Sequence, residues 1–131
     1  MILTMMKGKL HQARVTHSEL HYEGSCAIDE DLLDMVGILP NEQIQIYNAS
    51  NGNRFTTYAI TAPRGSRIIS VNGAAALLAS PKDVVIIVSY ATFEPKEAKL
   101  FKPKVALLNQ DNFVSSTKNV DSDSLKLSAC A

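Results

Sequence analysis

Short runs of β-branched and aromatic residues, separated by glycine, proline, asparagine and serine, recur through most of this chain. The runs lie at residues 15–17, 43–47, 55–61, 67–71 and 84–93. Such residues fit the pleated, half-buried surface of a strand, and the residues between the runs favour turns. Many short strands with little helix point to a small closed barrel, because closure removes exposed sheet edges. The sequence therefore predicts a mainly β protein.

One turn signal stands out within this pattern. Asn51 and Gly52 tolerate the positive φ angles of a two-residue type I′ turn better than other residues do. They lie between residues 43–47 and residues 54–61, and we expect these two strands to form a hairpin.

Helix signals are few. Asp29 can cap the start of a helix and Gly37, followed by Pro40, can end it, so one short helix is expected between them. A second helical turn is expected after Gly73, through the segment AAALLA.

Composition limits the class of partner. The chain has 131 residues, 46% of them hydrophobic, and its 13 basic and 13 acidic side chains cancel. One domain is expected, with no nucleic acid or membrane as partner and a small molecule as the ligand. The N-terminus does not resemble a secretory signal, and the longest apolar run, VVIIV, is too short to span a bilayer, so a cytoplasmic protein is expected.

The C-terminal part has a different composition. From about Asn109 the chain is rich in asparagine, aspartate, serine and lysine, with isolated apolar residues. We expect a folded domain over residues 1–113 and a disordered tail over residues 114–131. Cys26 and Cys130 form neither a disulfide framework nor a metal-binding spacing, and are interpreted as free thiols.

Gly24 and Ser25 place a hydroxyl next to a glycine, in a segment expected to be a loop. Taken alone, this pair is more often a solvated turn than a reactive site. The surrounding sequence changes that interpretation. The blocks KLHQARVTHSELHYEGSCAID at residues 9–29, NGNRFTTYAI at 51–60 and RGSRIISVNGAAA at 64–76 resemble the signature blocks of the aspartate 1-decarboxylase family, in the same order and at the same spacing.

The resemblance covers about residues 1 to 113 and has consequences for fold and assembly. It implies a six-stranded double-psi β-barrel with short helices. It also implies a homotetramer whose active sites lie between neighbouring subunits. Whether maturation needs a helper protein stays open.

The resemblance further implies a self-processing proenzyme. The Ser25 hydroxyl would attack the carbonyl of Gly24, and the resulting ester would eliminate to dehydroalanine and then hydrolyse to a pyruvoyl group. Residues 1–24 would become the β chain and residues 25–131 the α chain. Thr57 is the family residue associated with polarising the Gly24 carbonyl, although a threonine here is also an ordinary strand residue.

The implied reaction is the decarboxylation of L-aspartate to β-alanine and CO2, which supplies pantothenate and coenzyme A. The pyruvoyl cofactor on Ser25 would form a Schiff base with aspartate and act as an electron sink. Tyr58 aligns with the family's proton donor, and Arg54 with the residue that holds a substrate carboxylate. Which of the two carboxylates it holds is not determined. The implied substrate-binding residues are Lys9, His11, Tyr22, Arg54, Thr57, Asn72, Gly73, Ala74 and Ala75.

Two alternatives remain. His11, His17 and His21 could form a metal site if their segment were helical, but Val15 and Thr16 favour a strand and no acidic residue supports zinc, so no metal is expected. The other alternative is a non-catalytic barrel that binds a small metabolite, which would show no cleavage of the backbone.

Overall fold

The computed structural model describes residues 1–121 of the chain, and they form mainly strands. In chain order the elements are β1 (Leu3–Arg14), β2 (His17–Glu19), β3 (Ser25–Asp29), α1 (Glu30–Val36), β4 (Gln43–Asn48), β5 (Arg54–Ala62), β6 (Ile69–Asn72), the 3₁₀ helix η1 (Gly73–Leu77), β7 (Val84–Phe93), α2 (Pro95–Leu100), β8 (Lys104–Leu108) and β9 (Val114–Lys118). Within the described part of the chain, neither α-helix has the length and apolar character that crossing a membrane requires.

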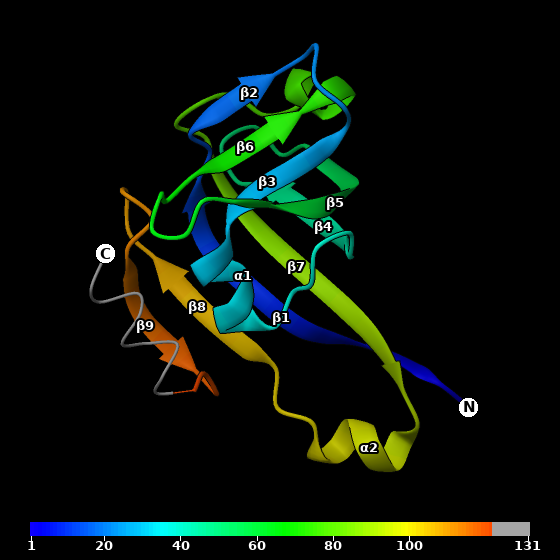
Figure 1. The fold of residues 1–131 in the computed structure, drawn as a ribbon. Helices are drawn as coiled ribbons and strands as arrows, with labels where there is room; N and C mark the ends of the chain where they lie inside the picture. The colour runs from blue at the N-terminus through cyan, green and yellow to red at the C-terminus, as the bar shows by residue number, and fades with distance from the viewer. Residues whose placement is uncertain (122–131) are drawn as a thin grey trace.

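The strands pair in the order β2-β6-β3-β5-β4-β7-β1-β8-β9. The long β1 and β7 run antiparallel along the molecule, while the shorter β2, β6 and β3 lie at one end of it (Figure 1). Over residues 1–121, β2 and β9 are the two ends of this order, so the sheet does not close. The mainly β prediction is confirmed, whereas the pairing does not reproduce the expected six-stranded closed barrel.

One apolar core lies under the sheet. Alternate residues of the strands point into it, and their side chains are almost completely buried. Strands β1, β3, β4, β5, β6 and β7 all contribute to it, through Leu10, Ala13, Cys26, Ile28, Ile44, Ile46, Ala59, Ile69, Val71, Val85 and Ile87. The residues between them point to the other side, which we call the outer face.

The expected hairpin forms, but with a different turn. β4 and β5 pair antiparallel, with Tyr47 opposite Arg54. Gly52 has a φ of 82°, whereas Asn51 is not among the residues with positive φ. The backbone N–H of Gly52 instead donates to the carbonyl of Asn48, which closes a longer loop. The two-residue type I′ prediction was therefore wrong.

Both helix predictions are confirmed. The Asp29 side chain accepts a hydrogen bond from the backbone N–H of Asp31, and Gly37 ends α1 in the left-handed conformation. η1 begins at Gly73, where a helical turn was expected.

Other boundaries differ from the expectations. The first strand was expected at residues 15–17, whereas β1 ends before them and β2 begins at His17. Residues 114–118 were assigned to a disordered tail but form β9, which pairs with β8. The domain therefore extends past residue 113, and the remainder of that tail, residues 122–131, lies outside the described residues. Residues 114–118 form a strand because they pair with β8, and such pairing cannot be recognised from the local composition.

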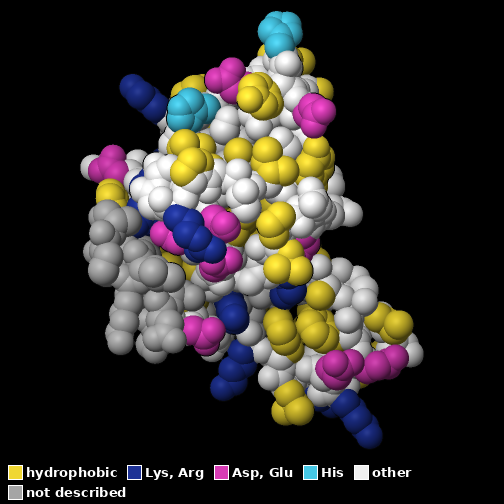
Figure 2. All heavy atoms as spheres, in the orientation of Figure 1, with side chains coloured by type: hydrophobic (Ala, Val, Ile, Leu, Met, Phe, Trp, Pro, Cys, Tyr) yellow, Lys and Arg dark blue, Asp and Glu magenta, His cyan; other side chains and the backbone are white. Residues whose placement is uncertain are grey.

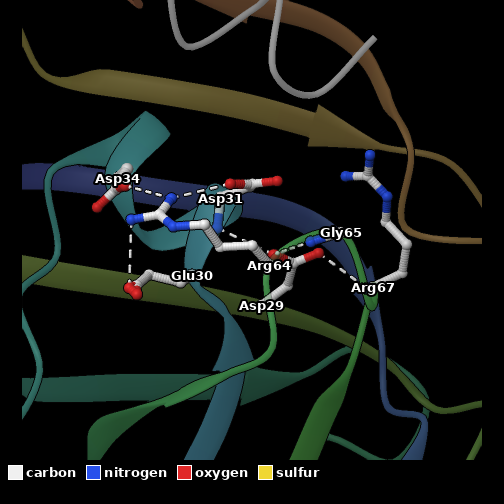
Figure 3. A network of polar contacts seen from close by, with 7 residues as sticks. All are labelled: Asp29, Glu30, Asp31, Asp34, Arg64, Gly65 and Arg67. Carbon is white, nitrogen blue, oxygen red and sulfur yellow. Dashed lines mark hydrogen bonds and ion pairs between the residues drawn. The ribbon is translucent and has the colours of Figure 1, made fainter. Parts of the chain in front are cut away.

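A buried carboxylate fixes the end of β3. Asp29 is fully buried, and its two oxygens accept hydrogen bonds from the backbone N–H groups of Asp31, Gly65 and Arg67, at 2.9, 3.1 and 2.8 Å. Figure 3 shows this carboxylate between the start of α1 and the turn after β5. Hydrogen bonds to a charged group are stronger than those between neutral groups, so Asp29 holds three segments together.

Arg64 adds a second connection between this turn and α1. Its guanidinium pairs with Asp31, Asp34 and Glu30 at 2.9, 2.7 and 3.2 Å (Figure 3). Hydrogen bonding to Asp31, followed by Asp34, raises the pKa of Arg64 above its ordinary value. Because the arginine is about half exposed, solvent screens these pairs, and the buried Asp29 is the stronger anchor.

Candidate active site

Ser25 is the first residue of β3 and is buried, at 2% exposure. It was expected on a loop, but it pairs with Asn72 of β6. Nδ2 of Asn72 donates to Ser25 Oγ at 3.1 Å, and the Ser25 hydroxyl donates to the carbonyl of Glu23 at 3.2 Å. The hydroxyl is therefore held in place by two hydrogen bonds, unlike that of a solvated turn serine.

Two glycines meet beside this hydroxyl. Gly73 has a φ of 72°, and a Cβ added to it would lie 2.6 Å from Cα of Gly24 and 3.1 Å from the carbonyl oxygen of Tyr22. Only glycine fits there, because of both its conformation and the available space. A Cβ at Gly24 would meet nothing within 4 Å, so the space beside the Cα atom of Gly24 in that direction is open. We call residues 22–25 and 70–75 the Ser25 region.

Strand β5 runs parallel to β3, with Ala59 opposite Cys26. If this register continues toward the N-terminus, Tyr58 lies alongside Ser25 and Thr57 lies alongside Gly24. Because side chains alternate along a strand, Tyr58 and Ser25 lie on the outer face, while Thr57 points to the opposite side. Tyr58 is 37% exposed, so its hydroxyl is accessible.

A groove of about 450 Å³ adjoins this arrangement. Tyr22, Asn72 and Ser70 line it, together with apolar residues that include Ala27 and Ile60. Figure 2 shows apolar side chains across the part of this face that carries β3, β5 and β6, and a compact group of charged side chains beside α1. The groove is large enough for a small ligand.

A second group of polar residues surrounds Arg54, at the start of β5. The Arg54 guanidinium lies 3.8 Å from the centre of the Tyr47 ring, and the hydroxyls of Tyr47 and Tyr90 are 2.7 Å apart. That hydrogen bond raises the pKa of Tyr90 above its ordinary value. Among residues 1–121, Arg54 has no carboxylate partner, so its planar fork is available to a ligand.

Lys9 and His11 lie on β1, three strands away from β5 in the sheet order. The two side chains lie on the same face of β1 and line a cavity of about 230 Å³ with residues of β8 and β9. Burial, followed by the charge of Lys9, lowers the pKa of His11. We call Arg54, Tyr47 and Tyr90 the Arg54 region, and Lys9 and His11 lie apart from it on the same outer face.

The structure gives less support to another nucleophile or to a metal site. Cys26 is fully buried, and burial raises its pKa to about 12, so the thiolate is not accessible near neutral pH. His17 lies on a strand, so the helical arrangement required for a histidine metal site does not form. Within residues 1–121, no three potential metal ligands come together.

The structure brings some of the expected site residues together and separates others. Ser25, Gly24, Asn72, Gly73 and Tyr22 form one cluster, and Ala74 and Ala75 continue from it in η1. Arg54 lies four residues before Tyr58, about 13 Å along an extended strand. Within one chain, Arg54, Lys9 and His11 are therefore not next to Ser25.

Two contacting residues were not identified from the sequence. Ser70 hydrogen-bonds Asn72, and Tyr47 packs against Arg54. Strand periodicity could have indicated Ser70, two residues before Asn72, and hairpin register could have indicated Tyr47, opposite Arg54.

A mainly β fold with a buried serine hydroxyl, two abutting glycines and an accessible arginine defines a candidate small-molecule enzyme. The family model of aspartate decarboxylase matches residues 1–115 of the 131-residue chain. The chain belongs to this family, and is thus a carboxy-lyase, as the resemblance implied. Membership argues against the alternative of a non-catalytic binding barrel.

Proposed function

We propose that this protein decarboxylates L-aspartate to β-alanine and CO2 with a pyruvoyl group made from its own Ser25. The observation that carries the proposal is that the buried Ser25 hydroxyl accepts a hydrogen bond from the Asn72 amide. This hydroxyl lies next to Gly24, against which Gly73 packs. Aspartate is the substrate because the family is defined by aspartate decarboxylation. The β-alanine would supply pantothenate and coenzyme A.

Cleavage would begin with attack by Ser25 Oγ on the carbonyl carbon of Gly24. The C–N bond breaks, an ester C–O bond forms, and the hydroxyl proton passes to the nitrogen of residue 25. Loss of the α-proton of residue 25 then expels the Gly24 carboxylate, and water converts the remaining dehydroalanine to the pyruvoyl group with release of ammonia. The products are a β chain of residues 1–24 and an α chain of residues 25–131.

The residues at this point fit such a group. A Cβ at Gly24 would meet nothing within 4 Å, which leaves room for the ends of the divided chain, and the Asn72 amide lies beside residue 25, where its NH2 group would donate to a carbonyl oxygen of the pyruvoyl group. When formed, the pyruvoyl group would supply the electron sink that decarboxylation requires.

The remaining proposed roles belong to other side chains of the chain. Arg54 would hold a substrate carboxylate, since its guanidinium lacks an acidic partner within residues 1–121 and matches a carboxylate bidentately. Tyr58, alongside Ser25, would donate the proton that completes β-alanine. Thr57, alongside Gly24, would polarise the carbonyl that is attacked. Lys9, His11, Tyr22, Gly73, Ala74 and Ala75 would complete the substrate-binding site.

The proposal includes a homotetramer with sites between subunits. Its support is the separation of Arg54 from Ser25, because Arg54 lies four residues, about 13 Å of extended strand, from the position alongside Ser25. Leu20 and Tyr22 are also exposed, at 45% and 67%, beside the Ser25 region. The single apolar core that the strands share supports the double-psi barrel, and the protein would act in the cytoplasm, with or without a maturation helper.

Intact mass spectrometry tests the proposal directly. We expect two fragments, residues 1–24 and 25–131, the larger one lighter by one ammonia than the same chain with an N-terminal serine. A single uncleaved chain that still converts aspartate would rule out the pyruvoyl mechanism. Cleavage without loss of ammonia would indicate simple hydrolysis of the ester.

A further inference from the structure

Ser70 is a polar residue of the Ser25 region to which the proposed chemistry assigns no role. It lies two residues before Asn72 on β6, so the two side chains are on the same, outer face of the strand. Their partners on β3 are Ala27 and Ser25. Ser70 and Asn72 are both buried, at 8% and 4% exposure, although both line the groove.

Three hydrogen bonds run in one direction through these residues. The Ser70 hydroxyl donates to Oδ1 of Asn72 at 2.8 Å, and Nδ2 of Asn72 donates to Ser25 Oγ at 3.1 Å. The Ser25 hydroxyl donates to the carbonyl of Glu23 at 3.2 Å. Each side chain therefore donates a hydrogen bond to the next group in the series.

The direction of this series fixes the orientation of the amide. Because the Ser25 proton is directed at Glu23, Ser25 Oγ can only accept from Asn72, so the NH2 end of the amide must face it. The amide oxygen then faces Ser70, its one hydrogen-bond donor within residues 1–121. Without the Ser70 hydroxyl, the buried Oδ1 of Asn72 would lose its hydrogen-bond donor. Rotation of the amide toward water in the groove would then lower the free energy.

We propose that Ser70 is a positioning residue for the self-cleavage, acting through the Asn72 amide on Ser25 Oγ. The inference rests on the proposed function, since it assumes that Ser25 attacks Gly24. Intramolecular attack depends steeply on the orientation of the nucleophile, and the Asn72 donor fixes the position of Ser25 Oγ next to Gly24.

The test is the rate at which freshly purified precursor divides into two chains on a denaturing gel. Ser70→Ala should slow this step about fivefold to tenfold, the factor expected for the loss of one neutral hydrogen bond. Ser70→Thr keeps the hydroxyl and should restore most of the rate. Ser89→Ala is the matched control: Ser89 is also buried on a strand, its hydroxyl has no hydrogen-bond partner within residues 1–121, and its loss should leave cleavage unchanged.

Two further measurements separate positioning from a general structural role. Thermal unfolding should show that Ser70→Ala is fully folded at the assay temperature. In an Asn72→Ala background, the same change should have no further effect on cleavage, because Ser70 acts through that amide. An equal loss in both backgrounds would overturn the inference.

The outcomes also separate this inference from the proposed function. If the wild-type chain cleaves and Ser70→Ala cleaves equally fast, the positioning role is wrong and the proposed function stands. If the wild-type chain never cleaves at Gly24, the proposed function itself fails.

Discussion

The Ser25 region and the Arg54 region occupy the same outer face but differ in burial and charge. Around Ser25 the side chains of Ser25, Ser70 and Asn72 are neutral, buried and hydrogen-bonded in series, and backbone packs directly on backbone at Gly73. Around Arg54 the groups are cationic or aromatic, more exposed, and without carboxylate partners within residues 1–121. The first arrangement suits a reaction of the chain with itself, and the second suits capture of an anion from solution.

This comparison makes a prediction about mutants. Under the proposed function, changes in the Ser25 region should affect cleavage, whereas changes in the Arg54 region should spare cleavage and affect turnover. Strand β5 connects the two regions and should contain residues of both kinds: Thr57 on one face for cleavage, and Arg54 and Tyr58 on the other for turnover.

The largest effect is expected from Ser25→Ala. The change removes only the attacking oxygen, so cleavage and decarboxylation should both be abolished while the protein still folds. A denaturing gel should show one band, and circular dichroism a β spectrum like that of the wild type. Normal division into two chains would eliminate Ser25 as the nucleophile.

Tyr58→Phe should separate the two activities. The ring stays, so packing and cleavage should be preserved, but turnover of aspartate should fall about a hundredfold to ten-thousandfold, the contribution of a positioned general acid. Release of CO2 and formation of β-alanine by the matured mutant would be followed together. Wild-type production of β-alanine would show that another group delivers the proton.

Thr57→Val should have the complementary effect. It keeps the shape of the strand residue but removes a donor alongside the Gly24 carbonyl, and losing one such donor costs about a hundredfold to a thousandfold in rate. The time course of cleavage would measure it. Thr56→Val is the control, because Thr56 donates to Gln45 on the other face of the same strand. Equal cleavage rates in both variants would leave Thr57 as an ordinary strand residue.

The smallest of these effects is expected from Arg54→Lys. Lysine keeps the charge but loses the bidentate fork and its stacking on Tyr47, so kcat/KM for aspartate should fall about tenfold to a hundredfold, with cleavage intact. Arg64→Lys serves as the control, since Arg64 pairs with carboxylates beside α1 and should leave these kinetics unchanged. If kcat/KM is unaffected in Arg54→Lys, Lys9 becomes the next candidate for the carboxylate.

Several elements could be predicted from the sequence because their signals are local. The cap at Asp29, the end of α1 at Gly37 and the long apolar run of β7 each depend on residues close in sequence. The family could also be predicted, because long blocks at fixed spacing are specific in a way that Gly24 and Ser25 alone are not. Local signals failed for β3 and β9, whose residues are ordinary in composition and become strands by pairing with distant partners.

The sequence by itself determined which side chains were available: a serine after a glycine, an arginine opening a strand, and a glycine at position 73. Only the tertiary structure decided their neighbours. Asn72 and Ser25 are far apart along the chain, yet antiparallel pairing of β6 with β3 joins them through a hydrogen bond, and Ser70 joins them by the alternation of the same strand. Arg54 and Tyr58 share one strand, yet its extended geometry separates them by about 13 Å. Strand register over long sequence separations set these relations, and a one-residue change in register would have turned the same side chains to the opposite face.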